Sequence, residues 1–334
     1  MRDLYYGLLT GILHEVFHLL EYKVSTMSGH EFDCAIILDE MSIDESLEYC
    51  TNNDKYFGTT TMPLSDELAT HALVFMLAGI HVRWKQFVAY DFTGNSIPRN
   101  CLKSILDQII CRAENIGLKV HFVTSDCGAS NKSMWQDYGV STKKETIYND
   151  LSIDHPVDAS RKLEFIPDPV HVFKNAINGW ISNSVIILPT WYVEEKGLSS
   201  NQVDRNDLTE FVKFERDQNL KMAHKLVESD VDFTNCKTSK VDKMKVSNST
   251  KYCNYSVAAA LMVLSENDGY NHFKATSSFL GDMARWFDLM SSRTTEDALD
   301  LSDRVKYDHN INHLKMMMDL VSEIKVYSYI IFMS

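Results

Sequence analysis

The sequence has few cysteines for its length, and none of them has the spacing of a metal site. Its 334 residues include 7 Cys, an odd number, and no C-x-x-C pair occurs. These counts argue against a disulfide framework and against a structural zinc site, and they fit a reducing compartment. We therefore expect the cysteines to be small core residues.

The chain also lacks an excess of basic residues and a long apolar run. It has 33 Lys and Arg against 46 Asp and Glu, a formal net charge of −13, which argues against a phosphate-neutralising DNA clamp. No stretch approaches the length of a membrane span, and the final YSYIIFMS is far too short. The apolar run near the start carries Arg2 and Asp3 and is not followed by a small-residue cleavage site, so no signal peptide is expected.

The residues that are present favour a globular protein of two domains. Hydrophobic residues make up 45% of the chain, enough for a sizeable core. Residues 14–18 read HEVFH, the H-E-x-x-H pattern that places two imidazoles one helical turn apart beside a glutamate base, within a predicted amphipathic helix. A zinc peptidase needs a third ligand, and Glu40 is the candidate, but its segment CAIILDEMSI is typical of a buried strand. Two ordinary helix histidines, His14 and His18, are the simpler interpretation.

The first half of the chain predicts an α/β domain. Apolar runs over 33–40, 72–82 and 84–92 predict three strands, and helical spacing over 96–117 predicts a helix. A short strand over 119–126 and a helix that begins at a glycine turn come next. This order is the opening of the ribonuclease-H-like fold, whose sheet is mixed. Beyond about residue 165 the patterns are mostly helical, with exposed connections predicted over 232–245 and 294–303.

Two aspartates end predicted strands of the first domain. Asp39 ends the first strand and Asp126 the fourth, and in the ribonuclease-H-like strand order these two ends come side by side. A carboxylate at the rim of a buried sheet is costly unless it is solvated or binds a cation. The pair is a candidate Mg²⁺ or Mn²⁺ site, and strand-capping turn aspartates are the alternative.

Several long blocks of the chain resemble the P-element-like transposases and their THAP-containing relatives. They run in the same order from about residue 15 to about residue 325 and read KVSTMSGHEFDCAIILDEMSIDESLEY, ALVFMLAGIHVRWKQFVAYDF, VTSDCGASNKSMW, DPVHVFKNAINGW, KMKV and WFDLMSSR. The resemblance implies a lead-in helix in 1–30, left from an upstream DNA-binding or dimerisation region. It also implies a ribonuclease-H-like core over 31–164, a helical GTP-binding insertion over 165–325 and a short apolar tail over 326–334.

The resemblance also implies a site for each cofactor. Asp39 and Asp126 match the first two catalytic acids that hold Mg²⁺ or Mn²⁺, and HEVFH has no metal role in this family. The guanine-nucleotide contacts match Lys225, Lys245, Val246 and Asp288, and Ser291 stands where the family usually has an asparagine. From the residues alone, the lysines would be a solvated basic face.

The resemblance implies DNA cleavage and strand transfer, but the chain departs from the family. We find no match to the third catalytic acid, which lies after the insertion in the family, and we expect the closing strand of the core to lie beyond Ser334 with it. No DNA-reading module is visible, although transposon-end DNA is the implied partner. We therefore expect a catalytically incomplete transposase fragment. The resemblance implies a nuclear protein, although the sequence has no clear nuclear localisation signal. We expect no membrane association.

The alternative is a non-catalytic, domesticated or regulatory protein that binds full-length transposase, through the helical domain, or other partners. A second copy of the chain is a further candidate partner. A zinc peptidase is a distant third interpretation.

Overall fold

The computed structural model describes residues 10–51, 54–98, 100–141, 152–183, 185–233, 246–292, 294 and 296–327. The chain divides into two compact units, Met1–Asp168 and Pro169–Ser334, which are described separately. The division falls four residues after the predicted boundary at 164. The predicted boundary at residue 30 does not separate two units, because the lead-in helix belongs to the first unit.

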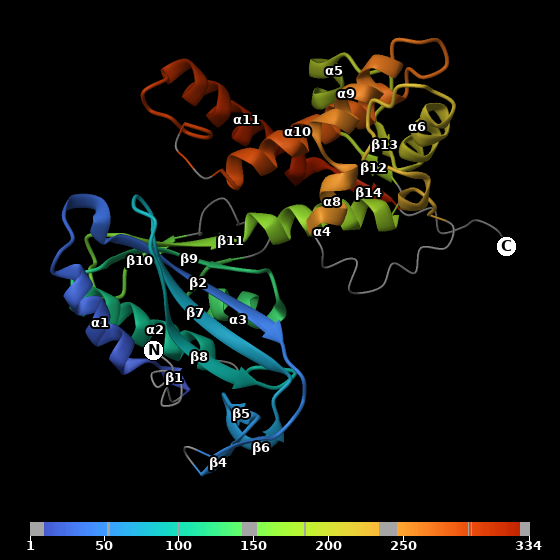
Figure 1. The fold of residues 1–334 in the computed structure, drawn as a ribbon. Helices are drawn as coiled ribbons and strands as arrows, with labels where there is room; N and C mark the ends of the chain where they lie inside the picture. The colour runs from blue at the N-terminus through green and yellow to red at the C-terminus, as the bar shows by residue number, and fades with distance from the viewer. Residues whose placement is uncertain are drawn as a thin grey trace. The chain divides into compact units, whose positions relative to one another are not determined.

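The first unit is built on a seven-stranded mixed sheet with the order β1-β8-β7-β2-β9-β11-β10 (Figure 1). β2 pairs antiparallel with β7 and parallel with β9, and β9 pairs parallel with β11. The strands are β1 (Gly11–Ile12), β2 (Asp33–Ser42), β7 (His71–Gly79), β8 (Lys85–Thr93), β9 (Lys119–Ser125), β10 (Ser152–Asp154) and β11 (Lys162–Pro167). This arrangement confirms the predicted mixed, ribonuclease-H-like sheet.

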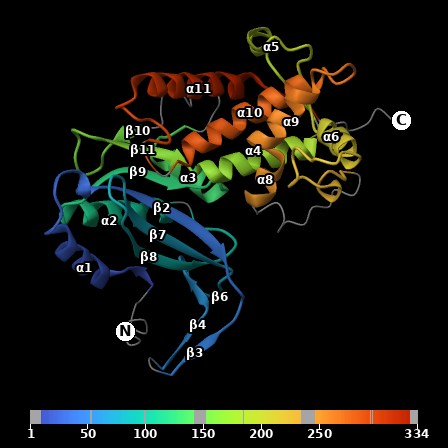
Figure 2. The same cartoon turned by 45° about the horizontal axis from the view of Figure 1, so that its top comes forward.

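Three helices pack into one hydrophobic core on this sheet (Figures 1 and 2). They are α1 (His14–Val24), α2 (Cys101–Asn115) and α3 (Ala129–Asp137). The apolar residues predicted at helical spacing in α2 are all buried, which confirms that helix, although it begins at Cys101 rather than near Ser96. In β2 the core side consists of Cys34, Ile36 and Leu38, so the alternating residues, Asp39 among them, point to the opposite face.

Two small hairpins are not predicted by the sequence. β3 (Glu48–Cys50) pairs with β4 (Lys55–Phe57), and β5 (Thr59–Thr61) pairs with β6 (Leu64–Leu68). Most of these strands are three residues long and mostly exposed, so they carry little of the alternating hydrophobic pattern from which strands are recognised.

The expectation that the sheet's closing strand lies beyond Ser334 is wrong. β11 occupies that position beside β9, with Phe165 opposite Val123 and Pro167 opposite Ser125. Leu163 and Phe165 are buried in the same core as the helices, and β10 pairs with the other side of β11 as the edge strand.

The second unit is mostly helical, as predicted, with a small antiparallel sheet of order β13-β12-β14. β14 includes the first residues of the predicted apolar tail. The described elements of the second unit are α4 (Pro169–Asn183), β12 (Val185–Ile187), α5 (Thr190–Lys196), β13 (Gln202–Asp204), α6 (Asn206–Arg216), η2 (Glu228–Asp230), α8 (Val246–Tyr252), α9 (Tyr255–Leu264), α10 (Phe273–Met290), α11 (Arg304–Glu323) and β14 (Lys325–Tyr327). One hydrophobic core joins them, and Trp180, Tyr192 and Phe211 are among its fully buried side chains.

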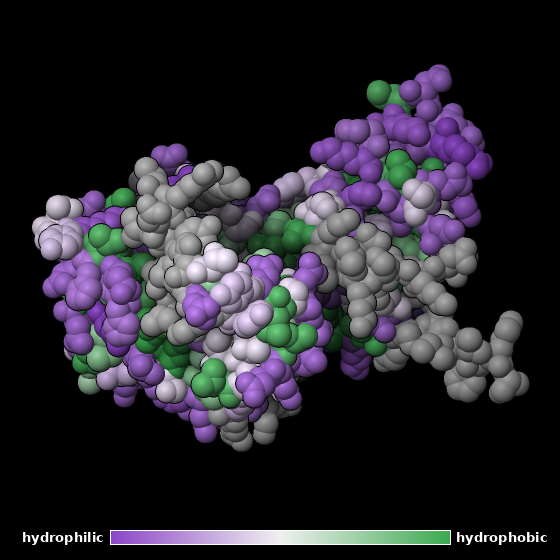
Figure 3. Space-filling view, turned by 60° about the horizontal axis from the view of Figure 1, so that its bottom comes forward, coloured by the Kyte–Doolittle hydropathy of each residue, from purple (hydrophilic) through white to green (hydrophobic). Residues whose placement is uncertain are grey.

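The surface is of mixed polarity. On the face drawn in Figure 3, hydrophobic residues form small patches among hydrophilic ones, as is usual for a globular protein. Among the described residues, no helix is both long and apolar enough to cross a membrane.

A buried carboxylate sits in the core of the second unit. Asp207 of α6 is 5% exposed; it accepts a hydrogen bond from the Thr276 hydroxyl and lies 3.7 Å from Nε2 of His272. Burial raises the pKa of Asp207 to about 7, although Thr276 and His272 act in the opposite direction. The folded chain therefore binds a proton here that the unfolded chain has lost, in the window between about pH 4 and pH 7.

We predict that the Asp207→Asn variant loses this pH dependence. A raised carboxyl pKa makes the folded state less stable as pH rises through the window, so the wild type should lose on the order of 2 kcal/mol more than the variant between pH 5 and pH 8. Urea unfolding at both pH values, followed by tryptophan fluorescence, measures the difference. Asp217→Asn, at an exposed site after α6, is the matched control, and equal pH dependence of the Asp207→Asn variant and wild type would refute the prediction.

Candidate functional site

The register of β2 and β9 places Asp39 and Asp126 at the same level. The parallel ladder pairs Ile36 with Val123 and Ile37 with Thr124. Counting two residues onward from the last of these pairs reaches Asp39 on one strand and Asp126 immediately after the other. The two aspartates therefore lie side by side toward the carboxyl-terminal ends of two neighbouring strands, as the sequence predicted.

The turn after β9 holds Asp126 in a fixed orientation. Its Oδ1 accepts hydrogen bonds from the backbone N–H of Gly128 at 2.9 Å and from Nδ2 of Asn131 at 2.6 Å. A Cβ atom at Gly128 would lie only 2.9 Å from that oxygen, so glycine permits the close approach. Asn131, which gave no signal in the sequence, is thus a positioning residue for the carboxylate, in the way that outer partners orient metal ligands.

Negative charge accumulates at this edge of the sheet. Burial raises the pKa of Glu40, His71 opposes the rise, and the carboxylates of Asp126 and Asp39 add to it. On the other side, β11 ends one residue before Asp168, whose backbone N–H bonds the carbonyl of Ser125 at 2.8 Å. Such an edge attracts cations, and its carboxylate oxygens are the ligands that Mg²⁺ prefers.

Among the residues described in the structure, neither Asp39 nor Asp126 belongs to a group of three potential metal ligands whose ligand atoms lie within 4.8 Å of one another. The HEVFH pattern forms no such group either. His14 begins α1, where its Nδ1 lies 2.9 Å from a guanidinium nitrogen of Arg112, and Glu40 lies on β2. The zinc-peptidase interpretation therefore has no assembled site in the described part of the chain.

In the second unit, Asp288 lies exposed in the last turn of α10, beside the loop that joins α8 to α9. Tyr255 donates a hydrogen bond to its carboxylate, and partial burial together with this partner raises the pKa of Tyr255 to about 12. A carboxylate in this position can accept from the N1–H and N2–H groups of guanine. Tyr255 gave no signal in the sequence, because its contact with Asp288 spans 33 residues.

The other predicted nucleotide contacts lie at separate places in this unit. Val246 is the first residue of α8, and Lys225 is exposed in the turns that precede η2. Lys245 lies outside the described residues. Ser291 comes directly after α10, and its hydroxyl donates to the carbonyl of Phe287 at 2.6 Å, so the side chain is bonded to its own helix. Val246 lies six residues before Tyr252, the last residue of α8. It is therefore about 9 Å along the helix axis from the end of α8 that precedes Tyr255, the partner of Asp288.

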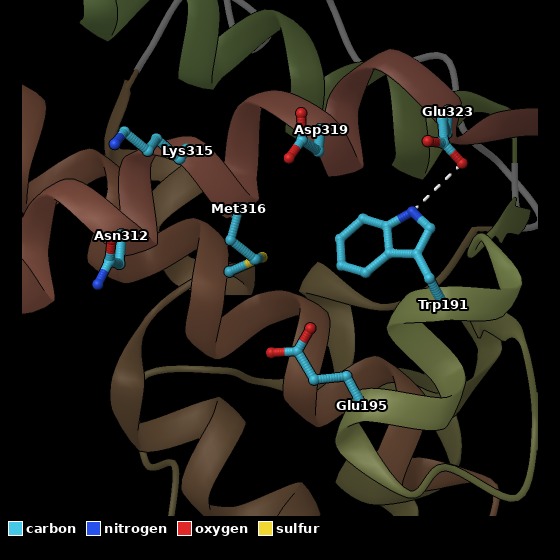
Figure 4. A pocket seen from close by; sticks show the side chains of 7 residues that line it. All are labelled: Trp191, Glu195, Asn312, Lys315, Met316, Asp319 and Glu323. Carbon is cyan, nitrogen blue, oxygen red and sulfur yellow. Dashed lines mark hydrogen bonds between the residues drawn. The ribbon is translucent and has the colours of Figure 1, made fainter.

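A cavity of about 470 Å³ lies elsewhere in the same unit, between α5 and α11 (Figure 4). Nε1 of Trp191 donates to Glu323 at 3.2 Å across it. Three carboxylates and one lysine line it, a balance that disfavours a triphosphate. It contains none of the predicted nucleotide residues; its lining is Trp191, Glu195, Asn312, Lys315, Met316, Asp319 and Glu323.

The strand order of the first unit defines a ribonuclease-H-like domain, and comparison with known proteins identifies its family. A TNP-like RNase H N-terminal domain matches residues 8–139, and a TNP-like GTP-binding insertion domain matches residues 193–298. The chain belongs to the P-element-like transposase family.

The relatives agree with the two domain matches. The chain is 21% identical over 271 residues to the transposable element P transposase of Drosophila melanogaster, a match that covers 80% of this chain and 31% of that protein. It therefore spans about a third of that relative. Its fold is similar to a chain of the Drosophila P element transposase strand transfer complex, with a TM-score of 0.72, 20% identity, and coverage of 94% of this chain and 63% of that one.

We predict that Asn131→Ala destabilises the first unit. Asn131 is 8% exposed, and its amide bonds a carboxylate, so its loss should lower the free energy of unfolding by about 1.5–3 kcal/mol. Urea unfolding measures the change. Asn115→Ala is the control, because Asn115 is exposed at the end of α2 and should change stability by less than about 0.5 kcal/mol. Equal effects of the two variants would contradict the assigned role of Asn131.

Proposed function

We propose that this chain is part of a P-element-type DNA transposase, with Asp39 and Asp126 as metal-binding catalytic residues. The observation that carries the proposal is their shared level on neighbouring parallel strands. In donor type the pair fits a hard divalent cation, because it supplies carboxylate oxygens and Asp126 is oriented by two donors. Bound Mg²⁺ or Mn²⁺ would polarise a phosphodiester and activate the attacking oxygen.

Asp39 and Asp126 would hold the cation, while Asn131 and Gly128 keep Asp126 in place. Two Mg²⁺ ions carry four positive charges, and the pair supplies two negative ones, so a third carboxylate is needed for the second ion. In the described residues, neither aspartate belongs to a group of three potential metal ligands whose ligand atoms lie close together. We therefore propose that the 334 residues alone bind the cation weakly and do not cut DNA. The partner would be transposon-end DNA, and the protein would then act in the nucleus.

The incomplete set of acids also favours the second candidate, a regulatory protein. A chain with an incomplete acid set could associate with full-length transposase without cutting DNA itself. An assay for cleavage by the transposase, with and without this chain, separates the two, since a regulator changes the rate while adding no activity of its own.

We propose further that the insertion domain binds GTP. The match to a GTP-binding insertion domain supports this, and the exposed carboxylate of Asp288 supplies the acceptor that guanine requires. Lys225, Lys245 and Val246 would contact the rest of the nucleotide. Because the Ser291 hydroxyl is bonded to Phe287, we expect the affinity to be modest.

We predict that Asp39→Asn and Asp126→Asn each weaken Mn²⁺ binding by at least about tenfold. Tenfold is the smallest loss typically seen when a residue that only hydrogen-bonds to a metal ligand is removed. Calorimetry with the full chain measures this, with Asp66→Asn, an exposed acid of β6, as the control. In a cleavage assay the chain should be inactive. A chimera that adds the family's C-terminal segment, with its third catalytic acid, should cut DNA, and this cutting should depend on both Asp39 and Asp126. Cutting that survives Asp126→Asn would exclude the mechanism.

We predict that Asp288→Ala abolishes the preference for GTP over ATP, because only guanine offers two N–H donors to this carboxylate. Ser291→Asn should strengthen GTP binding about fivefold, the equivalent of one hydrogen bond of about 1 kcal/mol. Calorimetry with both nucleotides measures each effect, and Asp268→Ala, at an exposed acid after α9, is the control. Unchanged discrimination in Asp288→Ala would reject the assignment.

A further inference from the structure

A second cluster of potential metal ligands lies in the first unit, around Asp33 at the opposite end of β2 from Asp39. Nδ1 of His30 lies 2.9 Å from Oδ2 of Asp33, and Nε2 of His81 lies 3.7 Å from the same oxygen. Nε2 of His121 lies 2.8 Å from Oδ1. Three imidazoles therefore surround one carboxylate, and one ligand atom each from His30, Asp33 and His81 lie within 4.8 Å of one another.

Backbone hydrogen bonds hold the turn that carries His81 beside Asp33. His81 lies in the turn between β7 and β8, and the N–H of Ile80 in that turn donates to the carbonyl of Asp33 at 3.0 Å. The turn is closed by a bond from the N–H of Gly79 to the carbonyl of Trp84, and a Cβ atom at Gly79 would lie 2.2 Å from the carbonyl oxygen of Val82. A side chain at Gly79 would therefore disrupt the turn.

His30 and His121 are positioned by separate elements. His30 lies in η1 (Gly29–Phe32), which is closed by two bonds from Ser28 to the Glu31 carboxylate, one from its backbone N–H at 2.8 Å and one from its hydroxyl at 3.1 Å. His121 lies on β9, where the ladder with β2 is irregular between Cys34 and Ala35. The cluster thus combines four segments that are up to 91 residues apart, and it is built by the fold rather than by a local motif.

We propose that His30, His81 and Asp33 form a binding site for a divalent metal of the zinc type. Imidazole nitrogen with one carboxylate oxygen is a donor set typical of Zn²⁺, and tetrahedral ligation at about 2.0–2.2 Å leaves adjacent ligand atoms roughly 3.3 Å apart. The separations of the two imidazole nitrogens from Oδ2, 2.9 and 3.7 Å, lie on either side of that value.

His121 acts as the positioning residue of this site. Its bond to Oδ1 fixes the Asp33 carboxylate so that Oδ2 faces the other two imidazoles. The side chains of His30 and His81 are 81% and 54% exposed, whereas that of Asp33 is 13% exposed, so a metal would enter from the surface onto a partly buried anchor. With three protein ligands, the fourth position is left to water.

The test is a Zn²⁺ titration of the full 334-residue chain by calorimetry, with Co²⁺ as a spectroscopic probe. We expect one saturable site, and visible bands typical of four-coordinate Co²⁺. His81→Gln and His30→Gln should each weaken binding by on the order of 100-fold, and His121→Gln by roughly tenfold, the range for outer partners. Zn²⁺ should also raise the Tm of the wild type but not that of His81→Gln, while the metal-free Tm values agree.

The matched control is the His14→Gln/His18→Gln double variant, which removes two exposed histidines from the HEVFH pattern and should bind Zn²⁺ as the wild type does. Weak binding by scattered surface histidines would be reduced equally in the control and in His81→Gln, and this result would overturn the proposal. Absence of saturable binding to the wild type would overturn it as well. If a histidine variant fails to fold, Asp33→Asn gives the same comparison at the anchor.

Discussion

The parallel pairing of β2 with β9 is the constraint on which both clusters of the first unit depend. Strand spacing and register are fixed by backbone hydrogen bonds, so the pairing decides which side chains meet at each end of the two strands. At one end it sets Asp39 level with Asp126. At the other end the ladder shifts by one residue between Cys34 and Ala35, and Asp33 meets His121 there. A shift of one residue would turn both sets of side chains to the opposite face.

The hydrophobic core makes that register unique. Ile36 and Val123 are fully buried at paired positions, and α1, α2 and α3 cover this face with apolar side chains. Sliding β2 by one residue would bury Asp39 in place of Leu38, at the cost of removing a charge from water. The carboxylates are therefore held outside by the same packing that holds the strands together.

Much of this could be predicted from the sequence, because β2, β7, β9 and α2 carry strong periodic patterns. β11 is not predicted, since KLEFIP is short and ends at a proline, and the family resemblance points instead to a closing strand on the far side of the insertion. Local patterns also misled in one case. HEVFH has two histidines at ligand spacing on one helix, but the histidines that meet a carboxylate, at positions 30, 81 and 121, have no common motif, and only the folded sheet brings them together.

Six residues of a strand span about 20 Å, so Asp33 and Asp39 place two differently composed sites at opposite ends of one element. The Asp39 end offers carboxylate oxygens, which suit Mg²⁺ and Mn²⁺, whereas the Asp33 end is dominated by imidazole nitrogen, which suits zinc. Metal selectivity depends on geometry, ligand type and metal availability, and the two ends differ in ligand type. The two proposals therefore do not compete for one metal, and losing either site leaves the strand pairing that builds the other.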